Sequence, residues 1–395
     1  MEQRLRVAML CSIYPPFPGG ASEAISRLAQ GLVSQGHQVT VYTADSFRGL
    51  KAPGEELLDG VRVKRVSKLV PDWLVLGRSV LNPWDVLRDL KNNVPDVLHL
   101  HGMALLGNDV AALAASHIPL ILTAHGPGFA RGPHRAWPIH LLWRAYLALM
   151  GKRVLKRATR IISLTPDELP YWRKWGVPDN RTSVIPWGIP EDCFRPRDGE
   201  QFKRQHGLQG PMILFVGSFH PSKGPQWLIS AFPKVLEEFP SVTALLCGPE
   251  LGYGSHLRSL AQSMGVDERV LLLGYVSREE LLNAYAACDI FVLPSDYEAF
   301  GLAIAEAMAF GKPVVASRVG AVPFLVEDGR SGFLVRPQHP PDLADRVVRL
   351  LQDDDLRRGL GERGQVLAQQ YRWTRIARQY EHVYLRAMQS RVAGK

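Results

Sequence analysis

The chain has 395 residues, which is long for one ordinary domain and sufficient for two. Its composition, 46% hydrophobic and 22% charged, is typical of a soluble globular protein, and no apolar run approaches the roughly 20 residues that a membrane-spanning helix needs. The formal net charge of +9 comes almost entirely from the first half of the chain, which predicts a basic surface there.

The first half has the pattern of a β-α-β unit that further strands extend. Residues 5–13 form an apolar run typical of a buried first strand and not of a signal peptide. A loop over residues 15–20 leads into a helical pattern over residues 22–35, and a second strand follows at residues 38–43. This order predicts a parallel sheet, with more strands at residues 61–66, 96–100, 119–124, 160–164 and 182–185.

A second alternation of strands and helices begins after a turn-rich linker at residues 185–196. Its strands are expected at residues 212–216, 242–247, 270–273, 290–293, 313–316 and 333–335. We therefore predict two parallel α/β domains, residues 1–190 and 191–372, and a C-terminal helix, residues 373–395, that can cross back to the first domain. Because such sheets bind ligands at the carboxyl ends of their strands, we expect a ligand in a cleft between the domains.

The strongest chemical signal is a pair of glutamates around a predicted helix start. The strand at residues 290–293 runs into a loop that holds Glu298, and a helix is expected from Gly301, with Glu306 in its second turn. Free amides at residues 300–303 and the helix dipole favour an anion there. One carboxylate can bind a sugar hydroxyl and the other a ribose, although either acid alone is more often a solvated surface group.

Two loops carry groups suited to phosphate. Lys223 lies six residues beyond Gly217, where a strand is expected to end, and its ammonium can neutralise a departing diphosphate. Gly19 and Gly20 let the backbone approach a phosphate or sugar closely just before a helix. A surface lysine in a turn and a plain glycine turn are the competing interpretations.

Two histidines lie at the ends of neighbouring predicted strands. His125 follows the strand at residues 119–124, where a side chain of a doubly wound domain faces the ligand crevice. His101 follows the strand at residues 96–100 and can share the same pocket. A capped or core histidine is the alternative interpretation for His125.

The basic surface centres on residues 131–160, within a stretch from Asp109 to Asp167 that has no acidic residue between its ends. Its cations alternate with Trp, Tyr and Leu, which fits either an interfacial helix on an anionic membrane or a core-packed helix with a basic solvent face. No basic motif of the known nucleic-acid-binding modules is present, so we expect no nucleic-acid partner.

The four scattered cysteines lack a CxxC spacing, which argues against zinc and disulfides and predicts a cytoplasmic protein, either free or peripheral on the inner membrane face.

Together these motifs resemble those of the retaining GT-B glycosyltransferases, the large family that includes sucrose synthase and bacterial glycogen synthase. The resemblance covers nearly the whole chain and is most specific at Glu298-x7-Glu306. Its other marks are Gly19-Gly20, the run of residues 123–126, the segment 184–189 and Gly217 followed by Lys223-Gly224. It implies an α/β fold of the GT-B type, with two Rossmann-like domains facing each other across a cleft.

The resemblance also implies residue roles. Glu306 would bind the donor ribose and Glu298 a hydroxyl of the transferred sugar, while Lys223 would hold the diphosphate. His125 would contact the donor sugar near its reacting face, so that His125, Glu298 and Lys223 form the catalytic set, and His101 lies on the acceptor side. The remaining implied donor contacts are Gly19, Gly20, Gly217, Ser218, Gly248, Glu250, Tyr275, Val276, Phe300, Gly301 and Leu302.

The sequence departs from the family pattern in three places. Ser218 stands where the family usually has Arg, so that either Lys223 with main-chain donors suffices or a residue such as Arg318 compensates. Trp187 stands where the linker commonly has Asn, and residues 319–324 lack a Glu that often follows that loop.

The predicted function is a retaining transfer of a hexose from a UDP-sugar or GDP-mannose to a glycan or lipid-linked acceptor. The matching motifs supply no carboxylate nucleophile near the anomeric carbon, so we expect attack from the leaving-group face. No carboxylate cluster of the metal-binding kind is present, so neither a metal nor a cofactor is expected. The alternatives are a sugar-nucleotide epimerase on the same fold and a catalytically silent nucleotide-sugar-binding protein.

Overall fold

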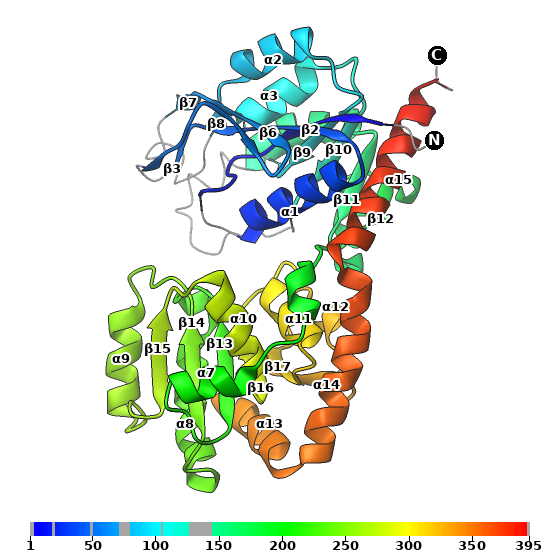
Figure 1. Cartoon of the computed structure of the whole chain (residues 1–395). Helices are drawn as coiled ribbons and strands as arrows, with labels where there is room; N and C mark the ends of the chain where they lie inside the picture. The colour runs from blue at the N-terminus through cyan, green and yellow to red at the C-terminus, as the bar shows by residue number, and fades with distance from the viewer. Residues whose placement is uncertain are drawn as a thin grey trace. The chain divides into compact units, whose positions relative to one another are not determined.

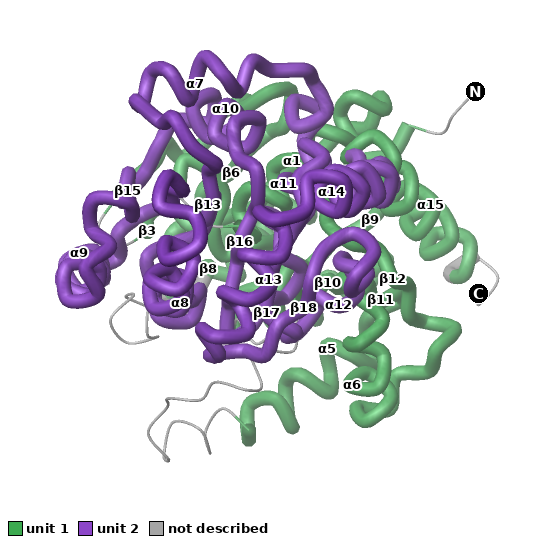
Figure 2. Tube along the Cα trace, turned by 90° about the horizontal axis from the view of Figure 1, so that it is seen from below, with its two compact units in different colours: residues 1–188, 373–395 green, residues 189–372 purple. Residues whose placement is uncertain are grey.

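The computed structural model describes residues 4–17, 20–47, 50–70, 80–103, 106–125 and 144–392. The chain forms two compact units: Met1–Gly188 together with Trp373–Lys395, and Ile189–Arg372 (Figure 2). The second unit is therefore an insertion in the first.

The first unit consists of the following strands and helices, shown in Figure 1. The strands are β1 Arg6–Leu10, β2 Gln38–Ala44, β3 Ser46–Phe47, β4 Leu50–Lys51, β5 Glu55–Leu58, β6 Val61–Val66, β7 Lys68–Val70, β8 Val80–Leu81, β9 Val97–His101, β10 Leu120–Thr123, β11 Arg160–Ser163 and β12 Thr182–Val184. The helices are α1 Gly20–Ser34, α2 Pro83–Asn92, α3 Leu106–Ala114, the π-helical turn η2 Leu147–Gly151, α5 Lys152–Arg157, η3 Pro166–Glu168, α6 Leu169–Lys174, η4 Asp179–Arg181 and α15 Trp373–Val392.

The sheet of the first unit has the order β12-β11-β10-β9-β1-β2-β6-β5. All neighbours in it are parallel except β5, which pairs antiparallel with β6. From β1 the chain adds β2 and β6 on one side and β9 to β12 on the other, which creates a switch point between β1 and β9. Ligands of open parallel sheets bind at the carboxyl ends of the strands beside such a point.

Helices cover both faces of this sheet. On one face α1 packs against α15, which also contacts β9 and β10 (Figure 1). Helix α1 buries Ile25, Leu28, Ala29 and Leu32, the apolar stripe that its sequence predicts. On the other face α2, α3 and α5 share one core cluster with the strands, including Leu90, Ala111 and Val154.

The second unit alternates strand and helix throughout. Its strands are β13 Met212–Val216, β14 Thr243–Cys247, β15 Val270–Gly274, β16 Ile290–Leu293, β17 Val314–Ser317 and β18 Gly332–Val335. Its helices are η5 Glu191–Phe194, α7 Gly199–Gln205, η6 Pro221–Lys223, α8 Pro225–Glu238, α9 Gly254–Ser263, α10 Arg278–Ala287, α11 Leu302–Ala309, α12 Val322–Leu325, α13 Pro340–Gln352, α14 Asp354–Ala368 and η7 Gln369–Tyr371.

The sheet of the second unit is fully parallel, in the order β15-β14-β13-β16-β17-β18. β13, β14 and β16 are almost continuously buried, as is typical of a parallel sheet with helices on both faces, whereas β15 at the edge is partly exposed. The chain runs outward from β13 to β15 and then returns to place β16 beside β13. The switch point of this unit therefore lies between β13 and β16.

The predicted α/β class with parallel sheets is confirmed, and every predicted strand corresponds to an observed one within a few residues. The sequence interpretation missed the short pairs β3-β4 and β7-β8 and the antiparallel strand β5.

The basic segment is described only from residue 144 onward, so its cations Arg131 and Arg135 lie outside the described residues. In the described part, Leu147, Val154 and Leu155 are buried, whereas Lys152 and Lys156 are exposed. This part therefore packs on the core and presents a basic solvent face, and membrane contact stays a prediction. No helix among the described residues is long and apolar enough to span a membrane.

Candidate active site

The switch point of the second unit brings together Lys223 and Glu298, two of the predicted catalytic residues. Glu298 lies in the loop after β16, and Lys223 lies in the loop after the neighbouring strand β13. The Lys223 Nζ donates to Glu298 Oε1 at 2.8 Å, and the Ser295 hydroxyl donates to the same oxygen at 2.8 Å. Glu298 is only 6% exposed, and these two donors hydrogen-bond its buried carboxylate.

Glycines let these two loops pack against each other. Gly224, next to Lys223, has a φ of +74°, and a Cβ on it would lie 2.0 Å from the Pro294 carbonyl oxygen. Gly320 has a φ of +48°, and a Cβ on it would lie 2.1 Å from the Glu298 carbonyl oxygen. A side chain at the position of Gly224 would separate the segments that carry Lys223 and Glu298, and one at the position of Gly320 would push the Glu298 loop away from the loop after β17.

Helix α11 starts directly beyond this pair. Gly301 adopts a φ of +93° as the residue before the helix, a conformation that L side chains rarely adopt. The first amides of a helix have no partners within it, and the helix dipole makes its start attractive to an anion. Helix α11 starts at Leu302, one residue after the expected Gly301, and its role as an anion site stays a prediction.

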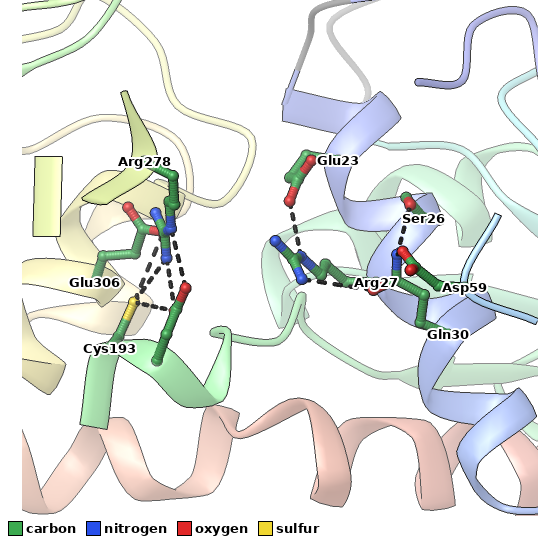
Figure 3. A network of polar contacts seen from close by, with 9 residues as sticks. Glu23, Ser26, Arg27, Gln30, Asp59, Cys193, Arg278 and Glu306 are labelled. Atoms are coloured by element: carbon green, nitrogen blue, oxygen red, sulfur yellow. Dashed lines mark hydrogen bonds and ion pairs between the residues drawn. The ribbon is translucent and has the colours of Figure 1, made fainter. Parts of the chain in front are cut away.

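Glu306, one turn into α11, is held by residues that the sequence interpretation did not identify (Figure 3). Its Oε1 accepts from Arg278 Nη1 at 2.7 Å, and its Oε2 accepts from the Tyr285 hydroxyl at 3.0 Å. Arg278 also binds Asp192, with Nη2 2.9 Å from Oδ1. Burial opposes the charge of Arg278, but the Glu306 and Asp192 carboxylates outweigh it and raise the pKa of Arg278.

The predicted nucleoside contacts lie at the carboxyl ends of β13, β14 and β15. The Gly217 amide donates to Cys247 at 3.0 Å, and the Gly248 amide donates to Gly274 at 2.7 Å, so the three strand ends form one edge. Gly248 is required there, because a Cβ would lie 2.0 Å from the Gly217 carbonyl oxygen.

Side chains at this edge differ in their availability. Tyr275 is 80% exposed, and Val276 beside it is half-buried. The Glu250 carboxylate is paired with Arg258 at 2.5 Å. Ser218 supplies no charge at the position where the family usually has Arg, and Arg318, the residue considered as its replacement, forms an ion pair with Asp328.

In the first unit, His101 and His125 lie next to each other, as their strand positions predict. His101 Nδ1 is 3.2 Å from His125 Nε2, and the two rings stack with centroids 5.3 Å apart. The ring of His99 is tilted against that of His101 with centroids 3.9 Å apart, and the ring of Trp187 lies 5.5 Å from His125. His125 also has a φ of 56°, which is unusual for a residue other than glycine.

Burial determines the charge state of these histidines. It lowers the pKa of His125 to about 4 and holds that of His101 well below its usual value. Both rings are therefore neutral at physiological pH, so each has one N–H donor and one acceptor nitrogen. Neither the His125 Nδ1 nor the His101 Nε2 has a hydrogen-bond partner among the described residues.

The glycine loop of the first unit is described only in part. Gly20 begins α1, whose start is held by a hydrogen bond from the Ser22 hydroxyl to the Phe17 carbonyl at 2.9 Å. A Cβ on Gly20 would meet no described atom within 4 Å. Gly19 lies outside the described residues, as does Gly126 beyond His125.

The residues that the structure describes contain no group of three or more His, Cys, Asp or Glu side chains that could hold a metal ion. All four cysteines are free and buried.

Two family models match the chain. The model of Glycosyltransferase Family 4 matches residues 18–192, and the model of Glycosyl transferases group 1 matches residues 197–366. A relative, the D-inositol 3-phosphate glycosyltransferase 2 of Catenulispora acidiphila, is 31% identical over 392 residues, which cover 94% of this chain and 91% of that protein.

Solved structures share the fold over nearly the full length. The sucrose-phosphate synthase of Thermosynechococcus elongatus superimposes with a TM-score of 0.80 at 24% identity, covering 98% of this chain and 100% of that chain. Anabaena HepE, in complex with UDP and glucose, gives a TM-score of 0.76 at 22% identity, covering 96% of this chain and 99% of that chain. Together with the two parallel α/β units, these matches show that the chain belongs to the group 1 and family 4 glycosyltransferases of the GT-B fold.

Proposed function

We propose that this glycosyltransferase transfers a hexose from a UDP-sugar or GDP-mannose to a glycan or lipid-linked acceptor, with retention of anomeric configuration and without a metal. The observation that carries the proposal is the convergence of Lys223 and Glu298, 2.8 Å apart, at the switch point beside α11. Such a point is where open parallel sheets bind nucleotides. The UDP and glucose bound to Anabaena HepE support a UDP-sugar as donor.

The second unit would bind the donor. The amides of Phe300, Gly301 and Leu302 would donate hydrogen bonds to the diphosphate. The Lys223 ammonium, which pairs with Glu298, would then also bind the phosphate oxygens. Glu298 would then accept from a hydroxyl of the transferred sugar. Glu306 would accept from the ribose at the other end of the donor.

The rest of the nucleoside would lie along the edge formed by three neighbouring strands. Backbone groups at Gly217, Ser218 and Gly248 would contact the nucleoside there. Backbone hydrogen bonds between the strand ends hold these groups along one edge. Tyr275 and Val276 would cover the base. The ion pair with Arg258 would orient Glu250.

The first unit would contribute the acceptor side, with Gly19 and Gly20 against the diphosphate. His125 would contact the transferred sugar, and because its ring is neutral it would act through a hydrogen bond and not as a charged acid. His101 would orient that ring from the acceptor side.

Because the matching motifs supply no carboxylate nucleophile near the anomeric carbon, we infer attack from the leaving-group face. The leaving phosphate would accept the proton of the acceptor hydroxyl as the new glycosidic bond forms and the bond to phosphate breaks. Lys223 and the helix amides would stabilise the charge that grows on the diphosphate.

A nucleotide screen followed by product analysis tests the proposal. We expect UDP-sugars or GDP-mannose to raise the melting temperature, since a ligand that binds only the folded state stabilises it. With the donor so identified and labelled in its sugar, the label should move to an acceptor from cell extract, with the anomeric configuration retained by NMR. Conversion of the donor to an epimeric nucleotide sugar would indicate the epimerase, and binding without any consumption would indicate a silent binding protein.

A further inference from the structure

Arg278 joins two carboxylates that come from different elements. Its Nη1 donates to Glu306 of α11 at 2.7 Å, while its Nη2 and Nε donate to Asp192 of η5 at 2.9 and 3.3 Å. Figure 3 shows the Arg278, Cys193 and Glu306 side chains pointing toward one another. The guanidinium thus uses all of its nitrogens within the second unit, and its planar fork fixes the direction of both carboxylates.

The position of Arg278 is unfavourable for a cation on local grounds. It is the first residue of α10, directly after the N-cap Ser277, whose side chain accepts from the Glu280 amide. The positive end of the helix dipole lies there, which favours acids such as Glu279 and disfavours an arginine. Since local preferences and structure usually agree, a conflict of this kind points to a role beyond helix stability.

The hydrogen bonds that Glu306 already accepts determine how many more its carboxylate can accept. A carboxylate has two oxygens with about four acceptor positions. Arg278 uses one position on Oε1, the Cys193 thiol makes a weak contact with the same oxygen at 3.9 Å, and the Tyr285 hydroxyl uses one position on Oε2. One acceptor position is left on Oε2, and a hydroxyl is a stronger donor than the thiol and can replace it on Oε1, so the carboxylate can accept from the two O–H donors of a vicinal diol.

The surroundings of Glu306 also restrict its rotation. Its side chain is 13% exposed, and the Cys193 thiol lies 3.9 Å from the same oxygen that Arg278 binds. Tyr285 is fully buried and stacks on Phe310 with centroids 5.6 Å apart, so its hydroxyl is fixed in place. The carboxylate is therefore held on both of its oxygens before any ligand arrives.

We propose that Arg278, supported by Tyr285, is a positioning residue that fixes Glu306 to accept from both hydroxyls of a ribose, and so makes the enzyme selective for ribonucleotide over 2′-deoxyribonucleotide donors. The inference rests on the proposed ribose role of Glu306 and extends it from binding to discrimination. Preorganisation is the physical reason, because a carboxylate that is free to rotate loses the geometry that two simultaneous hydrogen bonds require.

Calorimetric titration with free nucleoside diphosphates measures this selectivity without any transfer reaction. The probe is the diphosphate of whichever base the wild-type protein binds, compared with its 2′-deoxy form. The wild-type protein should prefer the ribonucleotide about tenfold or more, as expected for one hydrogen bond to a charged group. Arg278→Met should reduce the preference to about twofold, with most of the loss in ribonucleotide affinity, and Arg278→Lys should restore only part of it.

Two further variants separate positioning from general damage. Arg363→Met is the matched control, because Arg363 forms a bidentate pair with Glu327 at 2.8 and 2.9 Å elsewhere in the same unit, and its loss should leave the preference unchanged. Tyr285→Phe removes the hydroxyl that donates to Glu306 and should also lower the preference for the ribonucleotide. If Arg278→Met does not fold, Tyr285→Phe alone tests the proposal.

The outcomes distinguish this inference from the function on which it rests. An unchanged preference in folded Arg278→Met, or in Tyr285→Phe when Arg278→Met does not fold, would overturn the inference while leaving the donor site in place. Equal affinity of the wild-type protein for both forms would remove the ribose role of Glu306. Failure of the wild-type protein to bind any nucleoside diphosphate would refute the proposed function itself.

Discussion

Lys223 is the residue whose charge should matter most when the donor bond breaks. It pairs with Glu298 in the loop that leads into α11, and Ser218 supplies no second charge in the Lys223 loop. We expect Lys223→Met to lower kcat about 10²-fold with a smaller effect on donor affinity, because the diphosphate gains negative charge in the transition state. Steady-state kinetics with the identified donor measure both parameters.

The same substitution also leaves Glu298 with one donor fewer, so stability has to be followed in parallel. Lys234→Met is a suitable control, since Lys234 forms an exposed ion pair with Asp345 on the same unit. Both variants should melt as folded proteins, and only Lys223→Met should lose turnover. Normal kcat in Lys223→Met would rule out its assignment to the diphosphate.

Glu168 gives the first unit a pH dependence that is unrelated to the site. Its side chain is 3% exposed, and burial raises its pKa to about 7 against the opposing effect of the Leu164 backbone and the Ser163 side chain. Between its ordinary value of 4.5 and about 7, the folded state keeps a proton that the unfolded chain releases. Raising the pH through this window therefore favours unfolding, by about 3 kcal/mol in total.

Glu168→Gln should abolish this decline and be more stable than the wild-type protein at pH 8. Chemical denaturation of both proteins at pH 5, 7 and 8 measures the free energy of unfolding. Asp167→Asn, at the exposed neighbouring position, should leave the slope intact. Parallel pH curves for Glu168→Gln and wild type would mean that Glu168 is not the group responsible.

Residue identities in the site were predictable where the chain itself places them together. Lys223 and Glu298 each follow a predicted strand, and the order of an open parallel sheet brings such loops to one edge. Arg278 and Tyr285 were missed, since helix α10 meets Glu306 only through tertiary packing, and an arginine after a serine N-cap has no sequence signature. The only hint in the sequence was that Arg278 lies three residues after Tyr275, a predicted donor contact.

At the scale of elements, the long buried strands were predictable and the short edge pairs were not. Strands such as β13 and β16 are apolar runs bounded by turn residues, which is the clearest strand signal. The strands β3 and β4 have two residues each, and β5 has the exposed, charged sequence of an edge. Such an edge strand is stabilised by pairing with its neighbour, and it covers the edge of the sheet. Its own hydrophobic pattern therefore does not reveal it.

Helix α5 should determine whether the first unit contacts a membrane. Lys152 and Lys156 are exposed one turn apart, and Leu149 just before the helix is exposed as well. We expect the protein to sediment with anionic vesicles and not with neutral ones, because each cation near such a surface adds about 1 kcal/mol. Vesicle sedimentation at low and high salt measures this binding.

Reversing both charges, Lys152→Glu with Lys156→Glu, should weaken the vesicle binding by about tenfold or more. Reversal of two exposed arginines of the second unit, Arg269 and Arg330, changes the net charge equally and should have little effect. If the two double variants bind anionic vesicles equally, the binding depends on net charge and not on α5.

At the scale of the whole molecule, the proposed mechanism depends on main-chain amides and lysine for charge stabilisation. Transfer should therefore proceed at full rate in excess chelator, and added Mg²⁺ or Mn²⁺ should not accelerate it. A known metal-dependent transferase assayed in the same buffer is the control. Loss of activity in chelator with recovery on adding one divalent ion would show that a metal takes part.

The insertion of the second unit into the first has a consequence for synthesis on the ribosome. The polypeptide leaves the first unit at Gly188 and returns at Trp373, and α15 then packs against α1 and places the Tyr384 hydroxyl 2.7 Å from His99. A nascent chain emerges in order, so the inserted unit can finish folding while the earlier one still lacks its last helix. The half of the protein that is translated first is thus the half that is completed last.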